Sequence, residues 1–220
     1  MAYEPVPYDF ERVDPAESVQ RLLHVYAEAD RRRTVRMFSE QPVPREAIEL
    51  AILTAGTAPS GAHLQPWHFV AISDEQIKKE IREKAEAEER EFYDRRITPE
   101  WRGALEPLGT DFQKEHITKA PWLVIAFRRD YDILADGTKR KNYYMTESVG
   151  IAVGFFIQAL HRAGLATLTH TPAPMTFLRE ACNRPTNEKP FVLMPVGYPA
   201  ENCVVPNLRR KTLKEIAEFR

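Results

Sequence analysis

The stretch Thr57–Phe69, TAPSGAHLQPWHF, constrains the fold more than any other part of the chain. It separates a helical pattern that stops at Gly56 from an apolar, β-like run at residues 68–72. Small residues in its first half let backbone N–H groups approach a ligand, and Gly61 can adopt dihedral angles closed to other residues. Pro66 restricts its own dihedral angle and that of its neighbour, which fixes the chain as it enters the strand. The pattern fits a ligand-binding loop or a well-packed turn with a buried tryptophan.

A cluster of arginines, RRRTVR at residues 31–36, lies upstream of this loop. Runs of arginine are usually solvated, but Arg32, Arg33 and Arg36 stand at a spacing that suits a shared anion. Each guanidinium offers paired donors that match the oxygens of a phosphate group. No glycine-rich P-loop accompanies the cluster, so it does not indicate a nucleoside triphosphate.

Composition narrows the class of protein. With 220 residues, 43% of them hydrophobic and 29% charged, the chain can form one substantial core or at most two small domains. A net charge of −1 gives no attraction to nucleic acid or to an anionic membrane. Cys182 and Cys203 form no disulfide framework or zinc-ligand pattern, and neither a secretory signal nor a membrane-spanning run is present. We therefore expect a soluble, cytoplasmic protein without a metal site.

The remaining pattern predicts an α+β fold. Its strands do not alternate regularly with helices, which favours a mixed or mostly antiparallel central sheet flanked by helices. We expect one domain over residues 1–220, with a proline-rich extended arm at 1–14 and a C-terminal extension at about 200–220. The predicted helices are 16–29, 44–56, 74–95, 145–165, 175–182 and 213–219, and the predicted strands are 68–72, 121–127, 165–172 and 191–198, with a hairpin turn at 136–137.

The predicted helix 74–95 is unusually charged and carries little apolar surface. A helix that buries so little is weakly held, so residues from about 74 to 115 are expected to form a mobile lid. Glu89 and Tyr93 lie one turn apart and therefore on one face of this helix, and Lys114 follows after a loop. The alternative interpretation is an ordinary solvated helix.

The motifs RRTVRMF, PSGAH and QPWHF, followed by a threonine-rich strand and the run PVGYP, together resemble the nitroreductase superfamily of FMN enzymes. Within it, TAGTAPSGAH together with Glu89, Tyr93 and Lys114 resembles the iodotyrosine deiodinases. The resemblance runs from about Arg32 to Leu213. It implies the superfamily's fold, an intertwined homodimer with FMN bound between the two subunits.

The resemblance also implies roles for individual residues. It assigns the N–H of Ala62 to the substrate phenolate and the Thr171 hydroxyl to flavin N5, and we treat both as catalytic contacts. At position 170 the chain has histidine where the vertebrate pattern has threonine, which leaves the flavin contact of that residue open. The implied FMN contacts are Arg32, Arg33, Arg36, Pro59, Ser60, Thr169, His170, Thr171 and Arg210.

The substrate implied is a halotyrosine, which is a zwitterion at neutral pH. Glu89 can pair with its ammonium group, Lys114 with its carboxylate, and Tyr93 can form a hydrogen bond at the same end. The implied reaction is FMN-dependent reductive dehalogenation of 3-iodotyrosine, and of bromo- and chlorotyrosine, through one-electron steps. NAD(P)H is the expected electron donor, directly or through a reductase, although the chain has no G-x-G-x-x-G sequence for a stable dinucleotide site.

Two other functions remain open. A general NAD(P)H-dependent nitroreductase or quinone reductase would use the same flavin with a looser pocket. A non-catalytic protein that senses flavin or a tyrosine derivative would bind without turnover. The set of Glu89, Tyr93 and Lys114 argues against the first, because a nitroaromatic has no zwitterion for these residues to bind.

Overall fold

The computed structural model describes residues 3–220, and the chain divides into two compact units, one ending at Arg32 and the other comprising residues 33–220. In the first unit, residues 3–14 form neither helix nor strand, and α1 (Pro15–Asp30) follows. The side chain of Asp14 caps α1 by accepting a hydrogen bond from the N–H of Ala16 at 2.8 Å. The predicted helix at 16–29 is therefore confirmed.

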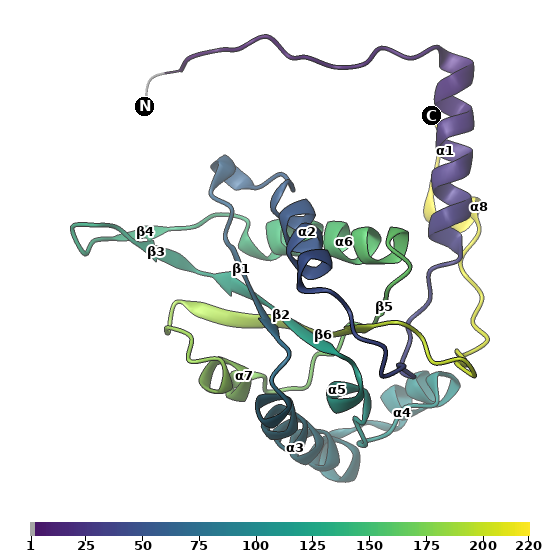
Figure 1. The fold of residues 1–220 in the computed structure, drawn as a ribbon, viewed down its shortest axis with the longest axis vertical. Coiled ribbons are helices and arrows are strands. Elements are labelled where there is room, and N and C mark those ends of the chain that lie inside the picture. Colours follow the sequence, from purple (N-terminus) through teal and green to yellow (C-terminus); the bar gives the residue numbers. More distant parts are fainter. Residues whose placement is uncertain (1–2) are drawn as a thin grey trace. The chain divides into compact units, whose positions relative to one another are not determined.

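The second unit is built on a four-stranded antiparallel sheet (Figure 1). Its strands, in spatial order, are β1 (Trp67–Ile72), β2 (Trp122–Arg129), β6 (Glu188–Gly197) and β5 (Ala166–Thr167). Each neighbouring pair runs antiparallel. The predicted α+β class with a mostly antiparallel sheet is confirmed.

Helices cover both faces of this sheet (Figure 1). On one face, α2 (Arg45–Gly56) and α6 (Met145–Arg162) pack against Val124 and Ala126 of β2. On the other face, β2 presents Leu123, Ile125 and Phe127 to the second group of helices. Since both faces of β2 are buried, alternate residues need not differ in polarity, which explains its unbroken apolar run. The second group consists of α3 (Glu75–Glu91), α5 (His116–Lys119) and α7 (Thr176–Ala181).

Shorter elements complete the unit. The predicted turn at 136–137 joins β3 (Tyr131–Ile133) to β4 (Lys139–Lys141) in an antiparallel hairpin. Among residues 3–220, no helix combines the length and the apolar character needed to cross a membrane. The remaining elements are η1 (Gly61–His63), the π-helical turn η2 (Phe92–Arg96), α4 (Pro99–Leu105), η3 (Glu106–Leu108) and α8 (Leu213–Ile216), which ends before the predicted Phe219.

The strand predicted at 165–172 is wrong in its length, because β5 contains only Ala166 and Thr167. In the register of β5 with β6, Leu168 would lie opposite Pro195. Proline has no N–H to donate across the ladder, so regular pairing stops there. A single bridge follows two residues later, where the N–H groups of His170 and Leu193 donate to each other's carbonyls at 2.9 and 3.0 Å.

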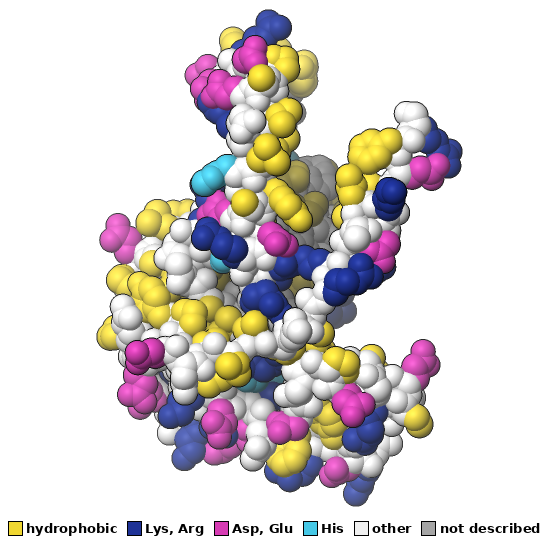
Figure 2. Space-filling view, turned by 90° about the vertical axis from the view of Figure 1, so that its right-hand side faces the viewer, with side chains coloured by type: hydrophobic (Ala, Val, Ile, Leu, Met, Phe, Trp, Pro, Cys, Tyr) yellow, Lys and Arg dark blue, Asp and Glu magenta, His cyan; other side chains and the backbone are white. Residues whose placement is uncertain are grey.

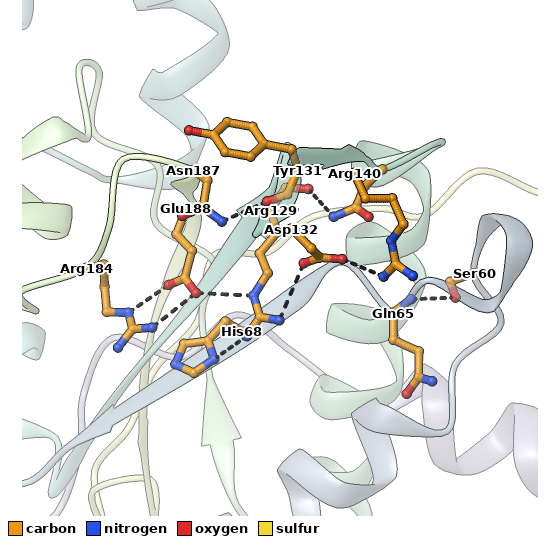
Figure 3. Close-up of polar contacts among 11 residues, drawn as sticks. Ser60, Gln65, His68, Arg129, Tyr131, Asp132, Arg140, Arg184, Asn187 and Glu188 are labelled. Atoms are coloured by element: carbon orange, nitrogen blue, oxygen red, sulfur yellow. Dashed lines mark hydrogen bonds and ion pairs between the residues drawn. The ribbon is translucent and has the colours of Figure 1, made fainter. Parts of the chain in front are cut away.

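A buried ionic network clamps the ends of β1, β2 and β6 (Figure 3). The carboxylate of Glu188, 3% exposed, accepts hydrogen bonds from Arg184 Nε at 2.7 Å and Arg129 Nε at 3.2 Å. Arg129 also lies 3.0 Å from Nδ1 of His68 on β1. Burial raises the pKa of Glu188, but the arginines outweigh it and hold that pKa below its usual value. The carboxylate is therefore ionised at neutral pH.

We predict that Glu188→Gln lowers the free energy of unfolding by about 2 kcal/mol, because it leaves two guanidinium groups without their shared charge. This predicted loss of stability is smaller than for a fully buried ion pair, since both arginines remain partly exposed. Urea denaturation measures the change, and Glu218→Gln, which removes an exposed pair with Arg220, is the matched control. Equal losses in both variants would contradict the assignment.

The pH dependence of this difference follows from the lowered pKa of Glu188. A carboxyl group with a depressed native pKa stabilises the fold above the pKa of the unfolded state. That stabilisation disappears as the pH falls through the native pKa. The difference in unfolding free energy between the wild-type protein and Glu188→Gln should therefore become smaller at acid pH.

Candidate active site

A cavity of about 310 Å³ lies in the second unit, between the end of α3 with the turns that follow it and the segment Leu168–Ala173. One part of its wall is polar, and the other part is apolar. The apolar part consists of Phe92, Trp101, Leu105, Leu108 and Leu168. The predicted site residues in the wall are Arg36, Glu89, Tyr93, Lys114, Thr169, His170 and Thr171.

The polar part of the wall is organised around the carboxylate of Glu89, whose side chain is 14% exposed. Its Oε2 lies 3.3 Å from Nζ of Lys114, and its Oε1 lies 3.0 Å from Nε2 of His170. Lys114, 4% exposed, also donates a hydrogen bond to the carbonyl of Asp111. Burial raises the pKa of Glu89, whereas the hydrogen bond from His170 and the charge of Lys114 lower it. The lowering effects together outweigh burial, so the pKa of Glu89 lies below its usual value. The structure thus holds a largely buried, ionised carboxylate with two different partners.

Two histidines lie side by side behind this carboxylate. The rings of His116 and His170 meet edge to face, with their centroids 5.7 Å apart. Burial lowers the pKa of His116 to about 3, helped by the positive charges of Lys114 and Arg36. Burial also lowers the pKa of His170, although Glu89 acts in the opposite direction. Both imidazoles are therefore neutral near pH 7.

Tyr93 belongs to the π-helical turn η2, which replaces the regular helix predicted as far as Arg95. Its Oη donates a hydrogen bond to the carbonyl of Thr110 at 3.1 Å, and its ring centroid lies 5.9 Å from Nζ of Lys114. Burial raises the pKa of Tyr93, so its hydroxyl stays protonated. Such turns frequently occur at functional sites. Here the turn places the tyrosine beside the Glu89–Lys114 pair.

Among the predicted arginines of the second unit, only Arg36 reaches the cavity wall. Its guanidinium is half-buried, and within residues 3–220 no carboxylate forms an ion pair with it. Arg33 instead donates a hydrogen bond to the carbonyl of Pro206. Arg210 is exposed in the segment after β6. Arg32 ends the first unit, and its role stays a prediction.

The loop predicted to bind a ligand, residues 57–66, lies outside the cavity wall as the described residues form it. Its backbone is strained, because Ala62, His63 and Gln65 have φ angles of 48°, 55° and 48°. The N–H of Gln65 donates to Oγ of Ser60 at 3.0 Å and holds the loop closed (Figure 3). Ala62 is exposed at the surface of this turn, and its predicted contact with a ligand stays a prediction.

Gly61 allows this loop to approach the start of α6. A Cβ atom at position 61 would lie 2.8 Å from Cδ2 of Tyr144 and 3.1 Å from the carbonyl oxygen of Tyr143. Real side chains do not tolerate the first distance, and the second is with rigid backbone. A side chain at position 61 would therefore force Tyr144 or the backbone at Tyr143 to shift, and glycine avoids this cost.

We predict that Gly61→Ala lowers the free energy of unfolding by about 1–3 kcal/mol, the usual cost of overpacking. Tyr144→Ala in the same chain should recover part of this loss, since it removes the nearer clash. Urea denaturation of the single and double variants gives the coupling between the two positions. Gly56→Ala is the control, because a Cβ there meets nothing within 4 Å. If the single and double variants lose equal stability, Tyr144 does not constrain the loop.

Several residues of the site are not marked by the sequence. Neither His116 nor the apolar wall stands in a recognisable motif. His116, Trp101, Leu105 and Leu108 reach the cavity from α4, α5 and the turns around them, which the sequence predicts only as a loop. A sequence pattern cannot show which of these residues share a cavity.

The comparison with protein families gives the class. The profile of the nitroreductase family matches residues 29–198. This range contains the arginine cluster, the strained loop and the whole cavity wall.

More similar proteins narrow the class. An iodotyrosine deiodinase from Haliscomenobacter hydrossis is 53% identical over 206 residues, which are 94% of this chain and 93% of that protein. One from Hydra vulgaris is 44% identical, with 96% of this chain and 78% of the relative covered. A crystal structure of oxidized iodotyrosine deiodinase bound to FMN and 3-iodo-L-tyrosine has a TM-score of 0.77 at 29% identity, covering 89% of this chain and all of that one. The chain belongs to the nitroreductase family and, within it, to the iodotyrosine deiodinases, which confirms the predicted resemblance.

Proposed function

We propose that this protein is an FMN-dependent reductive dehalogenase that converts halotyrosines to tyrosine and halide. 3-Iodotyrosine is the proposed main substrate, and bromo- and chlorotyrosine are the others. The similarity to named iodotyrosine deiodinases supports this function. The observation that carries it is the buried Glu89–Lys114 pair, 3.3 Å apart in the cavity wall.

This pair is suited to a zwitterion. A free amino acid that enters between Glu89 and Lys114 offers an ammonium group to the first and a carboxylate to the second. Each buried ion then exchanges one charged partner for another, so neither is left unpaired in a low-dielectric site. The hydroxyl of Tyr93 lies at the same end and can add a hydrogen bond.

The residues present fit FMN. Arg36 is a half-buried cation without a carboxylate partner among residues 3–220, which suits a phosphate group. Reduced FMN supplies two electrons with which a carbon–halogen bond can be broken, the ring carbon gaining a proton as the halide leaves. The other residues proposed to hold FMN are Arg32, Arg33, Pro59, Ser60, Thr169, Thr171 and Arg210, whereas the side chain of His170 is engaged by Glu89.

Two groups of the chain are proposed to act on the reacting centre. The backbone N–H of Ala62 would donate to the substrate phenolate and so stabilise negative charge on the ring oxygen. The hydroxyl of Thr171, which lines the cavity, would hydrogen-bond to flavin N5. NAD(P)H, acting directly or through a reductase, is the proposed source of the electrons.

The protein is proposed to act as a homodimer. Ala62 lies outside the cavity wall formed by the described residues of one chain, so a second chain is needed to bring it to the substrate. The outer sides of α2 and α6 expose apolar side chains, among them Leu50 (56% exposed), Leu53 (67%) and Phe155. Apolar side chains also gather on the surface visible in Figure 2. An apolar face on two helices fits a symmetric interface between copies.

The lid is proposed to be mobile only in part. Ile81 and Ala85 of α3 are fully buried against the sheet, which anchors the middle of the helix better than the sequence suggests. Beyond Glu88, the lid contains the π-helical turn and a contact between the rings of Phe92 and Trp101, 4.8 Å apart. We propose that this later part closes over the substrate, within a single domain of a cytoplasmic, soluble protein.

A titration of the FMN-loaded protein tests the function. 3-Iodotyrosine should quench the flavin fluorescence, whereas a nitroaromatic should not, because it cannot replace the charges of the Glu89–Lys114 pair. Adding dithionite should then release iodide and tyrosine in equal amounts. Quenching by the nitroaromatic alone would indicate a general nitroreductase, and quenching by 3-iodotyrosine without iodide release would indicate a binding protein.

We predict that Glu89→Gln and Lys114→Ala each raise the Kd for 3-iodotyrosine by at least about tenfold, since each removes one charged partner of the zwitterion. The Kd for FMN should change far less, because neither residue is proposed to contact FMN. Fluorescence titration measures both constants. Glu80→Gln, an exposed position on α3 paired with Lys84, is the matched control. Parallel losses of both ligands would overturn the assignment of the lid residues.

A further inference from the structure

His170 connects the lid to the sheet in a way that the resemblance to the deiodinases does not specify. Its backbone is fixed by the double hydrogen bond with Leu193 of β6, and its side chain is 9% exposed. Its Nε2 lies 3.0 Å from Oε1 of Glu89 on α3. All three residues of Thr169–Thr171 line the cavity, but Thr169 and Thr171 are exposed whereas His170 is buried. Glu89 is thus hydrogen-bonded to a residue whose backbone is joined to the sheet by an isolated bridge.

The chemistry of the partners fixes the form of the imidazole. The ionised carboxylate of Glu89 can only accept, so Nε2 of His170 must carry the proton. The opposite atom, Nδ1, is buried and has no hydrogen-bond partner within the described residues. A second proton on Nδ1 would have no acceptor. The charged imidazole would also be repelled by the positive charges of Lys114 and Arg36, and its nearest aromatic neighbour is the neutral ring of His116. His170 is therefore a neutral donor with a single proton on Nε2.

The two oxygens of Glu89 have different partners. Oε2 faces Lys114, which must turn to the substrate carboxylate when a zwitterion binds. Oε1 faces His170, which has no group to exchange. We propose that His170 is a positioning residue that holds Glu89 in place for the ammonium group of the substrate while Lys114 changes partner. The inference rests on the function proposed above.

A neutral donor is the suitable partner for this task. It orients the carboxylate, yet it leaves the negative charge of Glu89 available to the incoming ammonium group. A cation at position 170 would instead compete with the substrate for that charge. The resemblance places residue 170 among the flavin contacts, and the present proposal gives its side chain a task on the substrate side.

The test compares two ligands on the FMN-loaded protein, 3-iodotyrosine and 2-iodophenol. Only the first carries an ammonium group. His170→Ala should raise the Kd for 3-iodotyrosine about tenfold, as expected for a lost hydrogen bond to a charged group, and leave the Kd for 2-iodophenol and for FMN nearly unchanged. His170→Gln should restore most of the affinity, because its amide is a neutral donor of similar reach.

Several outcomes would overturn the role of His170. These are an equal loss of affinity for both iodinated ligands, a parallel loss of FMN, and no recovery in His170→Gln. If wild-type protein fails to bind 3-iodotyrosine, the proposed function falls and this role falls with it. If only the His170 variants behave differently from expectation, the proposed function stands and the inference alone is wrong.

A second measurement needs neither substrate nor variant. The ¹⁵N NMR signals of His170 in wild-type protein should show the neutral form protonated at Nε2 near pH 7. Its pKa should lie below the usual value of about 6.5. A proton on Nδ1, or a titration near the usual value, would overturn the proposal.

Discussion

The structure of the site depends on one requirement, that the buried carboxylate of Glu89 be paired. A charge taken out of water is stable only with close partners of matching chemistry. Those partners come from distant parts of the chain, Lys114 just before α5 and His170 beside the sheet. Pairing therefore joins three segments at one end of the cavity. In the proposed function, the ions that pair with each other here are the same ones that would recognise a charged ligand.

The sheet provides the fixed side of this arrangement. Strand β2 is buried on both faces, which makes the sheet a rigid layer between two groups of helices. Pro195 stops the ladder between β5 and β6, and the chain returns to β6 only at His170. The interruption leaves Thr169 and Thr171 free of regular pairing and exposed to the cavity. The interruption of the ladder between β5 and β6 thus leaves the hydroxyls of Thr169 and Thr171 at the cavity.

The sequence predicts those features that depend on a local pattern of residues or on motifs specific to a family. The unbroken apolar run of β2, the hairpin turn at 136–137 and the one-turn spacing of Glu89 and Tyr93 are of this kind. Other features depend on residues that meet only in the folded chain. The early end of β5 follows from Pro195, 28 residues away on another strand. Likewise, His116 enters the site through tertiary packing, and Arg33 binds the carbonyl of Pro206 instead of entering the cavity wall.

Selectivity in this site follows from pairing more than from shape. A ligand with only an ammonium group would draw Glu89 from Lys114 and leave the lysine as a buried, unpaired cation. A ligand with only a carboxylate would do the same to Glu89. A neutral aromatic would leave the pair intact but would gain nothing from the polar end of the cavity. Only a zwitterion satisfies both ions at once, so the proposed role of the Glu89–Lys114 pair is to select amino acids among the aromatic compounds that the cavity could hold.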